Sequence, residues 1–177
     1  MIEIRRITQS DDQTLAPLIA LYEASFPEEE RRELAQLKKL IDSAGQMFLN
    51  AVFFEDQIAG LFIYWKMDGF YYLEHLAVQP ELRNQKLGAR ILAWADQNLQ
   101  GLRLLEVEPD TTEMAARRIG YYKRNGYDIL TKDYVQPSYR TDEDACELWI
   151  MGNTDSADLD NYICQIKEHA YRRPQCL

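Results

Sequence analysis

The chain has 177 residues, of which 46% are hydrophobic and 28% are charged, so it is long enough to bury one sizeable core. With 20 Lys and Arg against 29 Asp and Glu, its net charge is −9, which argues against a primary role on nucleic acid or on an anionic membrane. The cysteines Cys146, Cys164 and Cys176 lack metal-ligand spacing and the N-terminus lacks a signal-peptide pattern, so we expect no metal site and a reducing, cytoplasmic setting. No apolar run approaches the roughly 20 residues that span a bilayer, so we expect no membrane span.

The N-terminal half is predicted to form a strand, two helices and an antiparallel meander. Residues 2–7 alternate as a strand, and Ser10 with Gln13 forms a capping-box pattern before a first helix. Pro27 and the three glutamates after it are typical of the first turn of a second helix, which ends at 43–45. Three strands are expected at 47–54, 58–67 and 70–78, the last two joined by the hairpin turn Asp68-Gly69.

After Pro80 the hydrophobic period changes from 2 to 3.6, which predicts a helix that ends at Gly101 and a strand at 102–108. A strand, a helix and a strand within about 40 residues predict a right-handed crossover with parallel strands. Further elements are expected as a helix at 112–124 capped by Asp110 or Thr111, strands at 127–136 and 145–151 around an acidic loop, and a helix at 159–171.

The predicted fold is therefore α+β, with a mostly antiparallel mixed sheet, helices on both faces, and one parallel strand pair, 70–78 with 102–108. Residues 1–152 are expected to form one domain and residues 153–177 a C-terminal helical extension of it.

The segment 81–89 lies between a strand and the first turn of a helix. Free backbone N–H groups and the positive end of the helix dipole converge there, Gly88 and Ala89 allow close approach to the backbone, and Arg83 and Lys86 add positive charge. Two interpretations stay open for this segment: a pyrophosphate-binding loop, or an ordinary loop with solvent-facing cations.

The run YYLEHLAVQPELRNQKLGARIL, followed by a strand and RRIGYYKRNGY, resembles the core of the GNAT superfamily of acyl-CoA-dependent N-acyltransferases. The order of elements from residue 1 to about 151 is also similar to that family. Two positions depart from its pattern. Lys86 stands where the first glycine of the pyrophosphate loop is usual, and Ala115 where many members carry an asparagine.

The resemblance implies acetyl-CoA as the acyl donor and a set of residues that bind it. The implied residues are the strand backbone at Leu76, Ala77 and Val78 and the loop residues Arg83, Asn84, Gln85, Lys86, Leu87, Gly88 and Ala89. It also implies that Tyr122 is the general acid that faces the coenzyme sulfur, whereas Tyr121 points about 100° away on a helix.

Glu74 is the predicted general base. It is the only carboxylate in the apolar strand FYYLEHLAV, and a half-buried carboxylate there is expected to have a raised pKa. The alternative is a structural carboxylate paired with an Arg or a Tyr. Strand alternation places His75 on the opposite face, so we expect only one of the two to line the cleft, with Glu74 favoured. Glu106 and Glu108 are interpreted as surface charges, with binding of a cationic acceptor as the alternative.

The acceptor site is predicted from the first two helices and the last strands, and two opposed hypotheses stay open for its charge. Arg31 and Arg32 would hold an acceptor carboxylate, whereas the acidic loop at 142–147 would attract a polyamine or a lysine side chain. The aromatic residues expected at the mouth are Phe26, Tyr134 and Tyr139.

The predicted function is acetyl transfer from acetyl-CoA to the primary amine of a small molecule or peptide by direct attack. One alternative is a non-catalytic acyl-CoA-binding regulatory module, and another is an interaction protein that uses its acidic C-terminal hairpin. A homodimer is compatible with the exposed terminal strands.

Overall fold

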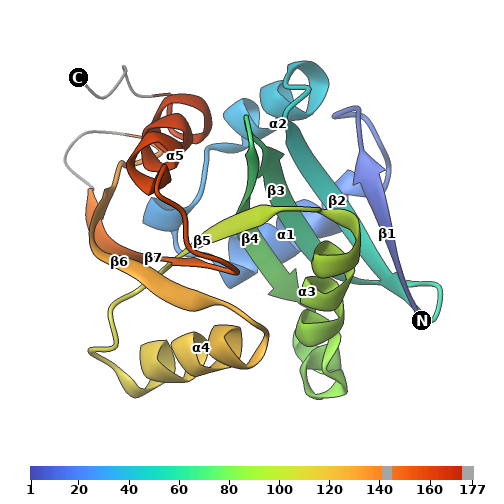
Figure 1. Cartoon of the computed structure of the whole chain (residues 1–177). Coiled ribbons are helices and arrows are strands. Elements are labelled where there is room, and N and C mark those ends of the chain that lie inside the picture. The colour runs from blue at the N-terminus through green and yellow to red at the C-terminus, as the bar shows by residue number, and fades with distance from the viewer. Residues whose placement is uncertain (141–144, 173–177) are drawn as a thin grey trace. The chain divides into compact units, whose positions relative to one another are not determined.

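The computed structural model describes residues 1–140 and 145–172 (Figure 1). Among these residues, seven strands form one mixed sheet in the order β1-β2-β3-β4-β5-β7-β6. The chain divides into two compact units, Met1–Lys66 with Glu74–Asn98, and Met67–Leu73 with Leu99–Leu177. Strand β4 (Phe70–Val78) belongs to both. The predicted mixed α+β sheet is confirmed.

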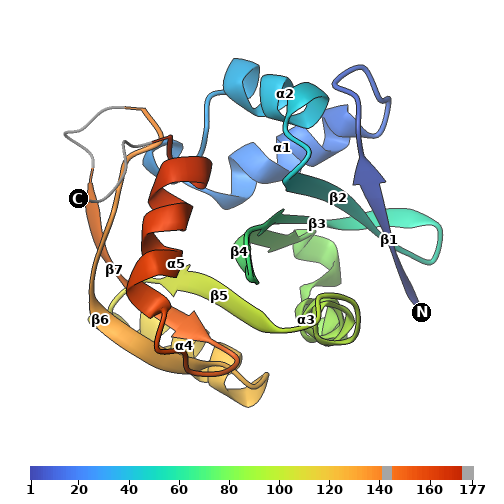
Figure 2. The same ribbon diagram turned by 45° about the horizontal axis from the view of Figure 1, so that its top comes forward.

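The first unit packs three helices on an antiparallel meander. Strands β1 (Ile2–Ile7), β2 (Met47–Phe54) and β3 (Gln57–Lys66) pair in antiparallel register. Helices α1 (Leu15–Ser25) and α2 (Leu34–Ser43) lie on one face of these strands, and α3 (Leu87–Asn98) lies on the other (Figure 2). Each helix buries one apolar stripe, because its leucines recur at helical spacing and the sheet faces are apolar.

Two predicted helix starts in this unit are wrong. Ser10 caps no helix, because its hydroxyl and its backbone N–H both bond to the Asp42 carboxylate at 2.7 Å. Pro27 begins no α-helix: the glutamates after it form the short 3-10 turn η1 (Glu28–Glu30), and the chain is extended at Arg31 before α2 begins at Leu34.

The second unit contains the parallel pair. Strands β4 and β5 (Leu102–Val107) are parallel from Phe70–Leu102 to Leu73–Leu105, which confirms the predicted parallel pair. Antiparallel pairs then join β5 to β7 (Cys146–Gly152) and β7 to β6 (Asp128–Gln136).

The turn and helix signals in this unit are mostly confirmed. Gly69 has a φ of 84° in the predicted Asp68-Gly69 turn, where the left-handed region favours glycine. Helix α4 (Glu113–Arg124) is capped by Thr112 rather than by the predicted Asp110 or Thr111. The C-terminal helix begins as α5 (Leu159–Gln165) and continues as the π-helix η4 (Ile166–Ala170).

Some predictions find no test in the structure. Residues 142–144 of the acidic loop and Cys176 lie outside the described residues. The division into a domain at 1–152 and an extension at 153–177 stays a prediction. In the described part of the chain, each helix is too short or too polar to cross a bilayer.

Candidate functional site

The loop between β4 and α3 contains a left-handed residue. After the 3-10 turn η2 (Pro80–Gln85), Lys86 adopts φ 57° and ψ 24°, and α3 then begins at the buried Leu87. Left-handed backbone costs a residue with a side chain about 1–2 kcal/mol, which explains why glycine is usual here in the family that the sequence resembles. Lys86 therefore keeps the left-handed backbone and adds a positive charge.

Exposed cations surround the beginning of α3. Arg83, Lys86 and Arg90 are all exposed, and the first N–H groups of a helix lack partners within that helix. Together with the dipole, these groups make the positive end of α3 suitable for an anion such as a pyrophosphate.

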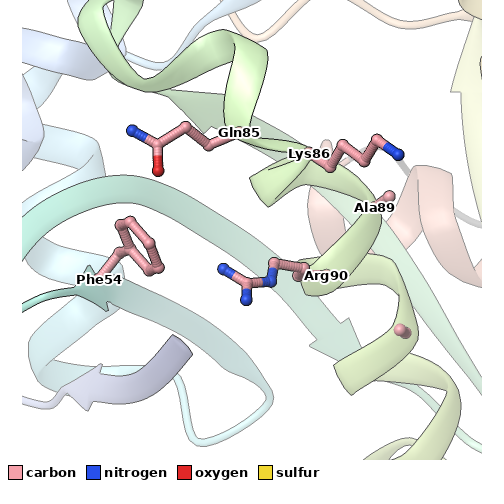
Figure 3. A pocket seen from close by; sticks show the side chains of 6 residues that line it. Phe54, Gln85, Lys86, Ala89 and Arg90 are labelled. Atoms are coloured by element: carbon pink, nitrogen blue, oxygen red, sulfur yellow. The ribbon is translucent and has the colours of Figure 1, made fainter. Parts of the chain in front are cut away.

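A pocket lies along the same helix and is lined by Phe54, Gln85, Lys86, Ala89, Arg90 and Ala93 (Figure 3). Its volume is about 610 Å³, within the range of about 300–1,000 Å³ typical of small-molecule sites. The side chains of Gln85 and Arg90 point toward Phe54, whereas Lys86 points away from it. The Arg90 guanidinium carbon lies 5.2 Å from the centre of the Phe54 ring, so cation–π attraction orients it.

The other residues that the resemblance implies for coenzyme binding differ in how far they are buried. Ala77 and Leu87 are buried, so only their backbone is suited to a ligand, whereas Leu76 and Val78 are half-buried. Asn84 and Gln85 are exposed, and Gly88 and Ala89 are half-buried. The side chain of Glu74 is fully buried although the residue keeps some exposed surface, so its exposed atoms belong to the backbone of β4.

Glu74 forms a buried ion pair with Arg32, and neither side chain has exposed surface. Trp65 Nε1 donates to Glu74 Oε2 at 3.1 Å, and His75 Nδ1 lies 3.7 Å from the same oxygen. Burial by itself would raise the pKa of Glu74, but Arg32 and His75 lower it to about 2. The raised pKa expected from the sequence is therefore wrong, and a carboxylate this acidic is a weak proton acceptor near neutral pH.

His75 lies close to Glu74 rather than in a separate environment. Its ring packs against Tyr22 and Phe26, with ring centres 5.1 and 4.4 Å away, and its Nε2 lies 3.0 Å from the backbone oxygen of Glu30. The 3.7 Å approach of Nδ1 to Glu74 shows that strand alternation does not separate the two side chains, contrary to the prediction.

Both arginines predicted to bind an acceptor carboxylate already have carboxylate partners. Arg32 pairs with Glu74, and Arg31 Nη1 lies 3.3 Å from Glu23 Oε1. Arg32 has no exposed surface, so a substrate has no access to its guanidinium in this structure. The prediction that Arg32 binds substrate is corrected on this ground.

In the second unit, Glu106 lies at the centre of a polar cluster that the sequence analysis missed. Among the described residues, hydroxyls of Tyr72 and Tyr171 donate to its Oε2 at 2.9 and 2.7 Å, as does Gln136 Nε2, and the Tyr134 hydroxyl donates to Oε1. Burial raises the pKa of Glu106, and the four donors oppose that shift without cancelling it. The surface-charge interpretation is thus wrong for Glu106.

The sequence of β5, the strand that carries Glu106, contained a signal that could have identified this cluster. Glu106 is a carboxylate in the apolar strand LRLLEV, the pattern that singled out Glu74. The surface-charge interpretation is correct for Glu108, which pairs with Arg118 at 2.7 Å with both side chains nearly half exposed. Two predicted aromatic residues join the cluster: Tyr134 donates to Glu106, and the Tyr139 hydroxyl donates to that of Tyr171 at 3.3 Å.

Tyr122 is half-buried on α4 in the same unit. Its ring centre lies 6.1 Å from that of Tyr127 and 5.3 Å from that of Tyr121. Burial raises the pKa of Tyr122, Arg118 lowers it and Tyr127 raises it, with a net increase. The phenol therefore keeps its proton at neutral pH, as a general acid must. Burial also raises the pKa of Tyr121, so this property alone does not choose between the two.

Ala115, which stands where many family members carry an asparagine, is buried in the first turn of α4, where its N–H donates to the Thr112 cap at 3.1 Å. Within the residues that the structure describes, no group of three or more His, Cys, Asp or Glu side chains is arranged to hold a metal ion.

Comparison with known proteins decides the family. The model of the acetyltransferase (GNAT) family matches residues 12–127, about two thirds of the chain. The chain belongs to the GNAT acetyltransferase family. The resemblance stated from the sequence is thereby confirmed, and with it the prediction of an N-acetyltransferase type of enzyme.

Solved structures agree with this GNAT assignment. A protein from Bacteroides thetaiotaomicron described as a GNAT-family acetyltransferase is 35% identical, with 97% of this chain and 99% of that chain covered and a TM-score of 0.92. The ribosomal-protein-S18-alanine N-acetyltransferase from Escherichia coli is 17% identical over 89% of this chain and 98% of its own, with a TM-score of 0.58.

A third solved structure is the PaiA N-acetyltransferase from Thermoplasma acidophilum in complex with coenzyme A. It is 16% identical over 88% of this chain and 99% of its own, with a TM-score of 0.55. The two more distant proteins share the fold only. The search of curated proteins found no match.

Proposed function

We propose that this GNAT protein transfers an acetyl group from acetyl-CoA to a primary amine of a small molecule or peptide by direct attack. The observation that carries the proposal is the loop before α3, where the left-handed Lys86 precedes the first helical N–H groups and exposed cations surround them. Such a loop supports the proposal because a phosphate group requires N–H donors and positive charge together.

The residues of the first unit fit the donor. The N–H groups of Leu87, Gly88 and Ala89 and the side chains of Arg83 and Lys86 would hold the pyrophosphate. The backbone of β4 at 76–78 would pair with the pantetheine arm as a strand does. When bound, acetyl-CoA supplies an activated thioester carbonyl and a thiolate leaving group.

Tyr122 is proposed as the general acid. Its phenol keeps a proton at neutral pH because burial raises its pKa, and it can donate that proton to a departing thiolate. Glu74 is not carried forward as the base. The ion pair with Arg32 holds its pKa at about 2, so in this proposal Glu74 is a structural carboxylate, the buried partner of Arg32.

The first test is a calorimetric titration with acetyl-CoA at low and high salt. We expect binding in about the micromolar range that weakens as salt screens the phosphate contacts. Absence of binding would refute the proposed donor. Binding without transfer to any amine in a broad screen would favour the non-catalytic acyl-CoA-binding module instead.

Two variants of Lys86 separate its charge from its backbone conformation. Lys86→Gly suits the φ of 57° and removes the charge, so we expect a stabler protein that binds acetyl-CoA more weakly and with less salt dependence. Lys86→Gln removes the charge but keeps the strain, and should lose the same affinity without the gain in stability. Lys38→Gln, on the exposed face of α2, is the matched control.

A further inference from the structure

The two oxygens of Glu106 have unequal hydrogen-bonding environments. Among the described residues, three donors converge on Oε2, from Tyr72, Gln136 and Tyr171, whereas Oε1 accepts from Tyr134 alone. Each oxygen of an ionised carboxylate offers about two lone-pair directions. The donors to Oε2 therefore fill its lone-pair directions, whereas the described residues use only one of the two lone-pair directions of Oε1.

The donors around Glu106 are all neutral. Three are phenols and one is an amide, so they stabilise the carboxylate by hydrogen bonding without neutralising its charge. This differs from Glu74, whose charge is balanced by Arg32. A part-buried carboxylate held by neutral donors is a favourable place for an ammonium group, because the charge-assisted bond to Oε1 would be strong.

The aromatic ring beside Oε1 already accommodates an ammonium group. Lys167 Nζ, from η4, lies 5.3 Å from the centre of the Tyr134 ring, a distance at which the ring quadrupole attracts a cation. The Tyr134 hydroxyl thus donates to Glu106, and the face of the Tyr134 ring contacts the alkylammonium group of Lys167.

We propose that Glu106 Oε1 and the Tyr134 ring form the binding site for the acceptor's ammonium group, and that the acceptor is an alkylamine without a carboxylate on the carbon that bears the nitrogen. This inference rests on the proposed acetyl transfer and names its acceptor class. The bound ammonium donates one N–H proton to Oε1, which leaves a neutral amine with a free lone pair and a protonated Glu106. The protonated carboxyl then releases that proton to water.

The absence of a carboxylate follows from the charges. A carboxylate on the carbon that bears the acceptor nitrogen would lie close to the Glu106 carboxylate, and two negative charges close together repel. Arg31 and Arg32, the cations predicted to bind such a carboxylate, have Glu23 and Glu74 as partners. Of the two hypotheses that the sequence left open, this inference therefore favours a cationic acceptor.

The test compares n-butylamine with norvaline, which is the same alkylamine with a carboxylate on the nitrogen-bearing carbon. Binding to the full-length protein is followed at neutral pH by NMR titration without coenzyme. We expect saturable binding of n-butylamine and weaker binding of norvaline. Tighter binding of norvaline would overturn the inference and would assign Lys167 to the acceptor carboxylate.

Two variants locate the site. Glu106→Gln should weaken n-butylamine binding at least about tenfold, because a charge-assisted bond is lost, whereas the surface control Glu108→Gln should not change it. Lys167→Met removes the competing ammonium over Tyr134 and should tighten binding several-fold, a gain that misfolding cannot produce. Unchanged affinity in Glu106→Gln or in Lys167→Met would refute the site.

Acetyl-CoA binding, measured separately, distinguishes the two proposals. If n-butylamine binds as expected but acetyl-CoA does not bind, the proposed acetyl transfer fails and the ammonium site stands. If acetyl-CoA binds and transfer occurs with Glu106→Gln as efficient as the unmodified protein, the ammonium site fails and acetyl transfer stands.

Discussion

Removing Arg32 should destabilise the protein far more than removing one partner of a surface ion pair would. The side chains of Arg32 and Glu74 are both completely buried, so Arg32→Met removes the guanidinium that balances the charge of the buried Glu74 carboxylate. Loss of one partner from a buried ion pair typically costs about 3–5 kcal/mol. The double variant Arg32→Met with Glu74→Leu removes both charges and should recover most of that loss, since well-packed apolar pairs replace buried ion pairs with little change in stability.

The pH dependence of stability gives a second measure of how much the buried ion pair of Glu74 contributes to the free energy of unfolding. The pKa of Glu74 falls from its ordinary 4.5 to about 2 in the folded protein, and at about 1.4 kcal/mol per pKa unit this corresponds to about 3 kcal/mol. Because the folded-state pKa is depressed, this stability is complete above pH 4.5 and is lost as the pH falls toward 2. The Glu74→Gln variant should lack this part of the pH dependence.

Urea unfolding followed by circular dichroism, at neutral pH and at intervals from pH 5 downward, measures both effects. Arg31→Met is the control, since its partner Glu23 is 42% exposed and such a pair contributes at most about 1 kcal/mol. If Arg32→Met loses no more stability than Arg31→Met, or if Glu74→Gln keeps the acid-dependent loss of the unmodified protein, the reasoning about the buried pair is wrong.

Three further predictions follow from single positions. Tyr122→Phe should keep acetyl-CoA affinity and lower the rate of acetyl transfer by about 10²–10⁴, measured as thiol release, while Tyr121→Phe stays near the unmodified rate; equal rates in both would remove the acid role. Gly60→Ala would place a Cβ 2.5 Å from a backbone oxygen of β4 and should cost about 1–3 kcal/mol of unfolding free energy, whereas Gly45→Ala, with open space around it, should not. Thr112→Ala removes the side-chain cap of α4 and should cost about 1 kcal/mol; an unchanged melting temperature would contradict the cap.

Most elements of the fold were predictable because their signals are local. The Asp68-Gly69 turn and the change of period after Pro80 each depend on a few neighbouring residues. The parallel pairing of β4 with β5 was also predictable, since a crossover of that length leaves few alternatives.

Local signals gave wrong helix starts where a side chain has a partner that is distant in the sequence. The Ser10 hydroxyl had the pattern of a helix cap, but it bonds to Asp42 in the structure. The glutamates after Pro27 had the pattern of a first helical turn, yet the chain is extended just after them, where Arg32 pairs with Glu74. Neither partner is visible from sequence spacing.

The family resemblance, the order of the elements and the position of the loop before α3 were predictable, because each depends on motifs of neighbouring residues. The surroundings of the two strand carboxylates, Glu74 and Glu106, were not predictable, because their partners are distant in the sequence. Both occur in apolar strands, but one meets the guanidinium of Arg32 and the other meets tyrosines as many as 65 residues away. The pKa of a buried carboxylate depends on the charge of its neighbours in space, so a carboxylate in an apolar strand has a lowered pKa at Glu74 and a raised pKa at Glu106.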